Sequence, residues 1–158
     1  MIFTGAVNSA SDIAGVRTVF EAYLRFIHQT LNNDLEFQGT DKEFTTFPDI
    51  YDALFAAKIG DKVVGACALK PFPEAGKCEL KRLYVKPEGR GRNFGHTLTG
   101  LCIKAAIEAG YDTMYLDTNP SLTHANTIYE AYGFKDIPAY YDNPMPGTRY
   151  MAIELIPS

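Results

Sequence analysis

The stretch of residues 79–95 constrains this chain more than any other feature, because it sets a short run of glycines and arginines between two regular segments. Residues 80–85 are rich in the types that suit a buried strand. Pro87 follows, and it has no backbone donor with which to continue a ladder. Apolar residues then recur at helical spacing, at Phe94, Leu98, Leu101, Cys102 and Ala105. The stretch therefore predicts a strand, a tight turn and a helix.

The turn has the properties of an anion-binding loop. Its glycines allow a backbone to approach a ligand closely, and the helix that follows offers unpaired N–H groups and the positive end of its dipole. Arg90 and Arg92 add positive charge beside that end. The Walker pattern G-x-x-x-x-G-K-[ST] is absent, and the dinucleotide pattern G-x-G-x-x-G would need a glycine where Phe94 stands. We therefore expect a different kind of phosphate-bearing ligand.

The loop resembles the pyrophosphate loop of the GNAT superfamily of acyl-CoA-dependent N-acyltransferases, which is written Q/R-x-x-G-x-G/A. Arg90 matches its first position and Gly95 its last. Asn93 stands in place of the middle glycine, and asparagine tolerates a left-handed backbone better than other residues with a side chain. Residues 125–134 resemble the family's other signature, A-x-x-[LF]-Y-x-x-x-G-F, with Asn126 after the alanine. The two motifs occur in the family's order, and the resemblance spans residues 55–155.

Periodicity and turn residues along the chain predict an α/β domain with a mixed sheet. The expected strands are residues 1–6, 53–59, 62–69, 77–85, 111–118, 134–137 and 149–156. The expected helices are residues 9–31, capped by Ser9 or Ser11, then 92–109 and 121–132. Residues 32–52 are expected to hold turns and one helical turn near Lys42. The resemblance implies a GNAT-like, mostly antiparallel central sheet with helices on both faces. It also implies a splay between the two central strands.

Composition is typical of one globular enzyme domain. The chain has 158 residues and a net charge of −4, so we expect one domain over residues 1–158 and no nucleic-acid partner, which would need a basic face. The cysteines lack the spacing of metal ligands, so we expect no metal and reduced thiols in a cytoplasmic protein. No apolar run approaches about 20 residues, so we expect no membrane span, and the N-terminus lacks a signal-peptide pattern. The sequence does not decide between a monomer and a homodimer.

Acyl transfer from a thioester to an amine requires a base, because free alkylamines have a pKa near ~10. Glu79 is the candidate base, acting directly or through a water, and Asp117 at the end of a neighbouring strand competes with it. The resemblance implies that Tyr129 protonates the departing coenzyme A sulfur. Each has a plain structural alternative: Glu79 as an exposed carboxylate beside Lys81, and Tyr129 as a core residue.

The resemblance implies acetyl-CoA as cosubstrate, with backbone N–H groups of residues 83–85 holding the acyl carbonyl and the pantetheine arm. The residues expected to bind it are Leu83, Tyr84, Val85, Arg90, Gly91, Arg92, Asn93, Phe94, Gly95, His96, Asn119, Asn126 and Tyr129. The acceptor pocket is expected to offer aromatic walls with a few polar groups. Its expected residues are Phe37, Gln38, Asp117, Tyr140, Tyr141 and Asn143.

The sequence thus predicts an N-acetyltransferase that moves the acetyl group of acetyl-CoA to the primary amine of a small molecule or amino acid, by direct attack in a ternary complex. Two alternatives stay open. The first is acetylation of a protein N-terminus or lysine, which an open groove would favour. The second is a non-catalytic module that binds acetyl-CoA as a sensor, which an absence of turnover would favour.

Overall fold

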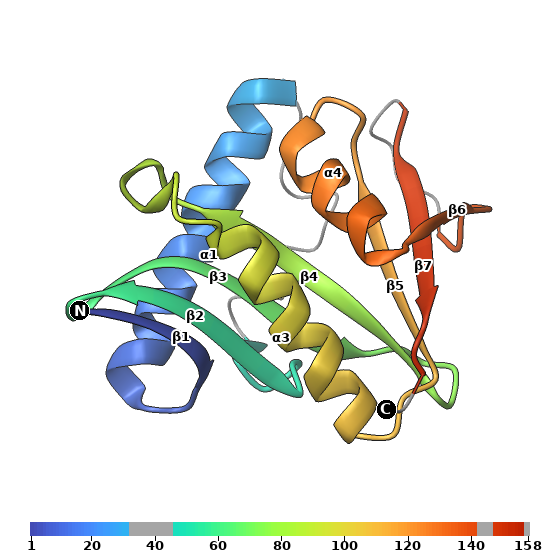
Figure 1. Ribbon diagram of the computed structural model, residues 1–158, viewed down its shortest axis with the longest axis horizontal. Coiled ribbons are helices and arrows are strands. Elements are labelled where there is room, and N and C mark those ends of the chain that lie inside the picture. The colour runs from blue at the N-terminus through green and yellow to red at the C-terminus, as the bar shows by residue number, and fades with distance from the viewer. Residues whose placement is uncertain (32–45, 142–146, 157–158) are drawn as a thin grey trace.

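The computed structural model describes residues 1–31, 46–141 and 147–156, which build one sheet with helices on both faces (Figure 1). The strands are β1 Ile2–Val7, β2 Ala53–Ile59, β3 Lys62–Pro71, β4 Lys77–Val85, β5 Thr113–Thr118, β6 Lys135–Ile137 and β7 Arg149–Glu154. Their order is β1-β2-β3-β4-β5-β7-β6. Neighbouring strands run antiparallel except β4 and β5, which are parallel. This confirms the predicted mixed, mostly antiparallel sheet.

The helices that pack on the sheet are α1 Ala10–Leu31, α3 Phe94–Glu108 and α4 Thr123–Tyr132. Helix α1 covers β2, β3 and β4 on one face, and α3 and α4 lie on the other (Figure 1). Ser9 caps α1, because its Oγ accepts a hydrogen bond of 3.2 Å from the Asp12 N–H. No helix within the described ranges is long and apolar enough to cross a bilayer.

The core has one apolar cluster on each face of the sheet, as expected for helices that bury one stripe each. Between the sheet and α1 lie buried side chains that include Val16, Phe20, Leu54, Ala56 and Ala66. Between the sheet and α3 lies a larger cluster that includes Leu69, Leu80, Leu98, Cys102 and Met114. Alternate residues of the central strands therefore contribute to opposite clusters.

Strands β4 and β5 separate soon after they pair. They are in register only at residues 77–79 with 113–115, whereas β4 continues to Val85 and β5 to Thr118. Beyond these residues no ladder joins the two strands, and they diverge. This is the splay between the two central strands that the family resemblance implies.

A bulge in β4 lies where the splay opens. The register with β3 changes from Ala66 opposite Tyr84 to Ala68 opposite Lys81. Two residues of β4, 82 and 83, therefore face one residue of β3. Arg82 has a φ of 61°, in the left-handed region. An extra residue of this kind bends its strand and removes backbone groups from the ladder. The bulge therefore leaves backbone groups of β4 outside the β3–β4 ladder, beside the splay.

Most element boundaries agree with the predicted ones within about two residues, the usual scatter of helix and strand ends. Helix α3 begins at Phe94 and not at residue 92, because Asn93 occupies the N-cap position. Helix α4 begins at Thr123 and not at residue 121, because the backbone and hydroxyl of Ser121 donate hydrogen bonds to Asn119 Oδ1 in the preceding turn. The turn expected near Lys42 lies outside the described residues.

Candidate active site

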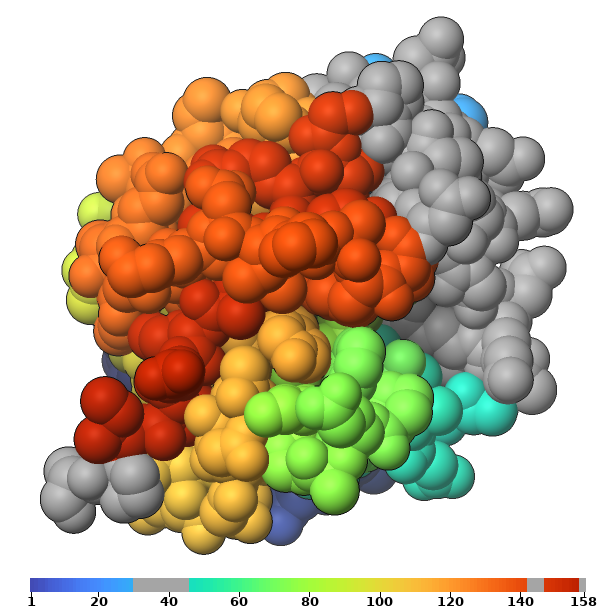
Figure 2. Space-filling view, turned by 90° about the vertical axis from the view of Figure 1, so that its right-hand side faces the viewer, coloured from blue at the N-terminus to red at the C-terminus, as the bar shows by residue number. Residues whose placement is uncertain are grey.

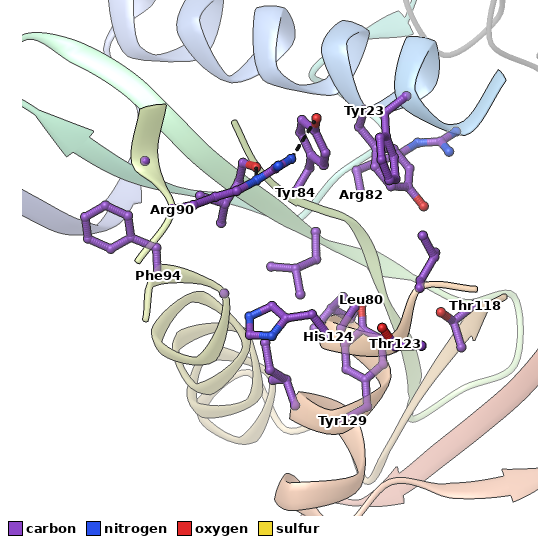
Figure 3. A pocket seen from close by; sticks show the side chains of 18 of the residues that line it. Tyr23, Leu80, Arg82, Tyr84, Arg90, Phe94, Thr118, Thr123, His124 and Tyr129 are labelled. Atoms are coloured by element: carbon purple, nitrogen blue, oxygen red, sulfur yellow. Dashed lines mark hydrogen bonds between the residues drawn. The ribbon is translucent and has the colours of Figure 1, made fainter. Parts of the chain in front are cut away.

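A cavity of about 520 Å³ occupies the splay between β4 and β5 (Figure 3). Its walls come from α1, β4, the turn that contains the 3-10 helix η2 (Pro87–Gly89), the end of β5 and the first turns of α4. The glycine-rich loop and the 125–134 motif, which are far apart in the sequence, both line it through residues such as Arg90 and Tyr129. The fold therefore brings the two predicted motifs to one place.

The loop before α3 has the backbone shape that the sequence predicts. Asn93 has φ 62° and ψ 25°, so it adopts the left-handed conformation expected of the missing glycine. Gly91 also has a positive φ of 85°. A Cβ at Gly95 would lie 3.0 Å from Cδ1 of Ile128 on α4, so the Ile128 side chain would have to shift to admit a larger residue there. Both Phe94 and Gly95 line the cavity, which places the N-terminus of α3 at its edge.

The two loop arginines differ in position. Arg90 lines the cavity, and its guanidinium donates hydrogen bonds to the Val85 carbonyl at 3.2 Å and to the Tyr84 hydroxyl at 3.3 Å (Figure 3). Arg92 is exposed and does not line the cavity. His96 also stands outside it, stacked on Tyr132 with ring centroids 4.6 Å apart. Of the three groups, only Arg90 stands at the cavity wall.

Tyr129 lies in the wall of the cavity and is 6% exposed. Its ring packs edge-on against Phe134 with centroids 5.7 Å apart. Burial raises the pKa of its phenol well above the ordinary value, and the nearby Tyr23 and Cys67 act in the same direction. The phenol is therefore protonated at neutral pH, the state in which it can donate a proton.

Asn126 is buried and hydrogen-bonded within the chain. Its side-chain oxygen accepts a hydrogen bond of 2.8 Å from the Thr118 hydroxyl, and its side-chain nitrogen donates one of 2.9 Å to the Asn119 carbonyl. Thr118 lines the cavity, whereas Asn126 and Asn119 do not. The structure thus places these two predicted cofactor residues in the joint between β5 and α4, behind the cavity wall.

The two candidate bases lie on the α1 side of the sheet in different surroundings. Glu79 is 6% exposed and accepts a hydrogen bond of 2.9 Å from the Tyr140 hydroxyl. It does not line the cavity, whereas Asp117 does. Asp117 forms an ion pair of 3.5 Å with Lys81 and accepts a hydrogen bond of 2.7 Å from the Tyr141 hydroxyl.

These partners control the charge of Asp117. Burial by itself would raise the pKa of its carboxyl. The Lys81 ammonium, the Tyr141 hydroxyl and the Arg82 guanidinium together outweigh burial, so the pKa lies below its ordinary value. Asp117 is therefore a stable anion that is already paired with a cation.

Aromatic side chains surround Tyr140. Its ring lies 5.4 Å from that of Phe72 and 5.2 Å from that of Tyr115. The Tyr150 ring lies 5.1 Å away, and its hydroxyl donates a hydrogen bond of 2.7 Å to the Tyr141 carbonyl. Figure 2 shows the end of β3 and the following turn, in green, beside the orange segment before residue 141. The predicted acceptor residues Tyr140 and Tyr141 thus belong to an aromatic cluster that holds both carboxylates.

Several cavity residues were not predicted as site residues. Tyr23 and Phe26 of α1, and Ser121, Thr123 and His124 at the start of α4, all line it. The α1 residues belong to an apolar helical stripe that indicates only core packing, and nothing local signals that the splay faces them. Phe37, Gln38 and Asn143 lie outside the described residues. Within the described ranges, no group of three or more His, Cys, Asp or Glu side chains could hold a metal ion.

Comparisons with known proteins agree with this geometry. Residues 20–134 match the model of the acetyltransferase (GNAT) family. An uncharacterised N-acetyltransferase of Schizosaccharomyces pombe is 35% identical over 98% of this chain and 95% of its own length.

Solved structures share the fold. An acetyltransferase of the GNAT family from Staphylococcus aureus superposes with a TM-score of 0.78 at 18% identity, over 99% of this chain and 100% of its own. The PaiA N-acetyltransferase of Thermoplasma acidophilum, solved in complex with coenzyme A, superposes with a TM-score of 0.72 at 18% identity, over 98% of this chain and 99% of its own. Since the family model covers most of the sequence, the chain belongs to the GNAT family of acetyltransferases.

Proposed function

We propose that this protein transfers the acetyl group of acetyl-CoA to the primary amine of a small molecule or amino acid, by direct attack within a ternary complex. One observation carries the proposal. The glycine-rich loop, the bulge of β4 and Tyr129 all line a single cavity in the splay. A phosphate site, backbone N–H donors and a proton donor are the parts that acyl transfer from a thioester needs.

Coenzyme A is proposed to place its pyrophosphate on residues 90–96. Arg90 and the N-terminus of α3 offer donors there. Arg90 donates hydrogen bonds to the Val85 carbonyl and the Tyr84 hydroxyl, and phosphate oxygens would replace these acceptors when coenzyme A binds. The pantetheine arm would then follow residues 83–85 into the splay. The coenzyme A complex of the Thermoplasma acidophilum relative supports this class of cosubstrate.

The chain's groups can be assigned to the steps of transfer. Backbone N–H groups at the bulge would hold the acyl oxygen, a contribution typically worth ~3 kcal/mol. The amine nitrogen bonds to the carbonyl carbon, and its proton passes to Glu79 directly or through a water. As the C–S bond breaks, the Tyr129 phenol gives its proton to the sulfur. An amine bound as an ammonium loses one proton to Glu79 before it attacks, and the second nitrogen proton, lost as the amide forms, restores the Tyr129 phenol. Glu79 then returns its proton to solvent, so the net reaction releases the amide, the free thiol and one proton.

Glu79 fits the role of base better than Asp117. Asp117 is paired with Lys81 and its pKa is lowered, which makes it a weak proton acceptor. Glu79 is buried and bonds to the neutral Tyr140 hydroxyl. We propose that Asp117 orients Lys81 and Tyr141 around the acceptor.

The decisive experiment is a panel of amines, amino acids and peptides with free N-termini, each incubated with acetyl-CoA while released thiol is measured. Turnover of free amines or amino acids supports the proposal. Turnover of peptides alone would make the protein a peptide N-acetyltransferase. Calorimetric binding of acetyl-CoA without turnover of any acceptor would make it a sensor module. Three free buried cysteines fit the reducing cytoplasm as its proposed location.

A further inference from the structure

Side chains on the α1 side of the sheet form rows that cross neighbouring strands, because residues in register share a face. In one row, Lys70 of β3 lies opposite Glu79 of β4, and Glu79 pairs in register with Tyr115 of β5. In the next row, Lys81 of β4 and Asp117 of β5 face each other across the splay. Each row therefore holds one lysine and one carboxylate on neighbouring strands.

The two rows differ in how their charges are paired. Lys81 and Asp117 form an ion pair of 3.5 Å. Lys70 and Glu79 do not, although side chains directly opposite in an antiparallel pair have Cβ atoms only about 4.5–5.5 Å apart. Glu79 turns instead to the Tyr140 hydroxyl. Across the described ranges, neither Lys70 nor Glu79 takes part in an ion pair.

An anion buried to this degree is costly unless a cation or several hydrogen bonds compensate it. Glu79 is 6% exposed and has one hydrogen bond from a neutral group. Opposite it lies the ammonium of Lys70, which is half-buried and also has no ion-pair partner among the described residues. Adjacent charges of opposite sign that do not neutralise each other are complementary to a zwitterion, which brings an ammonium to one and a carboxylate to the other.

We propose that Lys70 and Glu79 recognise an α-amino acid as the acceptor, with its ammonium on Glu79 and its carboxylate on Lys70. The inference rests on the proposed function and narrows its acceptor class. The ammonium then lies on the group that receives its proton. The aromatic rings of Phe72, Tyr115 and Tyr140 stand beside this pair and offer an apolar wall to the amino-acid side chain.

The test compares acceptors that differ only in the carboxylate, such as phenylalanine with phenethylamine and alanine with ethylamine, by kcat/KM with acetyl-CoA. We expect the parent protein to prefer the amino acids. Lys70→Met should raise KM for the amino acids by about tenfold or more and leave that for the amines within about twofold. Lys70→Glu should shift the preference toward a diamine. Lys135→Met, on exposed β6, is the matched control and should retain the parent's preference.

Two results would count against the inference alone: a parent protein that prefers the amines, or a Lys70→Met variant with the parent's preference. Absence of turnover with every free amine would overturn the proposed function instead. In that case calorimetry of phenylalanine with the coenzyme A-saturated protein decides the inference separately. Binding that is weakened in Lys70→Met supports it, and equal or absent binding overturns it.

Discussion

The Thr118 hydroxyl at the end of β5 donates a hydrogen bond of 2.8 Å to the side-chain oxygen of Asn126 on α4. The other end of the same amide bonds to the Asn119 carbonyl. These contacts fasten α4 to β5 less than one helical turn before Tyr129. Asn126 is therefore placed to position Tyr129 in the cavity wall.

We expect Thr118→Val to leave the buried Asn126 oxygen without its partner. The free energy of unfolding should fall by about 1–3 kcal/mol, and kcat should fall while the dissociation constant of coenzyme A changes little. Thr127→Val on the same helix is the control, since its hydroxyl is exposed and donates a hydrogen bond to the Thr123 carbonyl one turn earlier. Urea unfolding, kinetics and calorimetry measure the three quantities. Weaker coenzyme A binding with normal kcat in Asn126→Ala would show that Asn126 serves the cofactor, as the family resemblance implies.

Local sequence signals were sufficient to predict the loop shape and the individual strands, whereas the family resemblance supplied the arrangement of the sheet. Asn93 replaces a glycine, yet its tolerance of positive φ predicted the loop shape that the structure has. The hairpin across Gly60 and the strand before the loop were predicted for the same reason: turn residues and alternation act over a few residues.

Such local signals do not predict contacts between residues that are far apart in the sequence. Tyr140 bonds to Glu79 across 61 positions, and Tyr23 reaches the cavity only because α1 crosses the sheet beside the splay. A cofactor contact of Asn126 stays a prediction, and local signals do not predict the hydrogen bonds that its amide makes to β5 and the turn after it. Partners of this kind are set by topology, so periodicity can identify the residue without identifying its contacts.

Arg90 and Arg92 should differ in their contributions to cofactor affinity. Arg90 lines the cavity and Arg92 does not. We expect Arg90→Ala to weaken coenzyme A binding by about tenfold, as for a lost charge-assisted contact, and Arg92→Ala to have a smaller effect. Calorimetry at low and high salt measures both. If both variants bind coenzyme A as tightly as the parent protein, the pyrophosphate does not bind at this loop.

The pH profile of Glu79→Gln tests the base. If Glu79 accepts the amine proton, the loss of turnover should be largest near neutral pH, where the free amine is mostly protonated. The loss should shrink as rising pH supplies neutral amine from solution. Steady-state rates from about pH 6 to pH 10 measure it. A profile parallel to the parent's would indicate a different proton acceptor.

Asp117 should make the free energy of unfolding depend on pH in the acid range. Its pKa in the folded protein is lowered from 3.8, so at low pH the unfolded chain binds more protons. Its contribution is therefore complete above its ordinary pKa and lost as the pH falls through the folded value. We expect the difference in unfolding free energy between the parent and Asp117→Asn to shrink below about pH 4. Urea unfolding across this range measures it, and a constant difference would contradict it.

Tyr129→Phe removes a single oxygen from the cavity wall. The ring is retained, so its contact with Phe134 should survive and Tm should stay close to the parent's. If the phenol protonates the thiolate, turnover should fall by ~100-fold, as is typical of a lost general acid, while coenzyme A affinity stays within a few-fold. Kinetics with the best acceptor, calorimetry and thermal unfolding separate these effects.

Tyr132→Phe on the same helix is the matched control for this change. Its hydroxyl donates a hydrogen bond of 2.9 Å to the His96 carbonyl, and Tyr132 does not line the cavity. We expect it to lower stability with little effect on turnover. The opposite pattern, with Tyr129→Phe keeping near-parental turnover but unfolding at a much lower temperature, would make Tyr129 a core residue. The thiolate would then leave unassisted or receive its proton from another group.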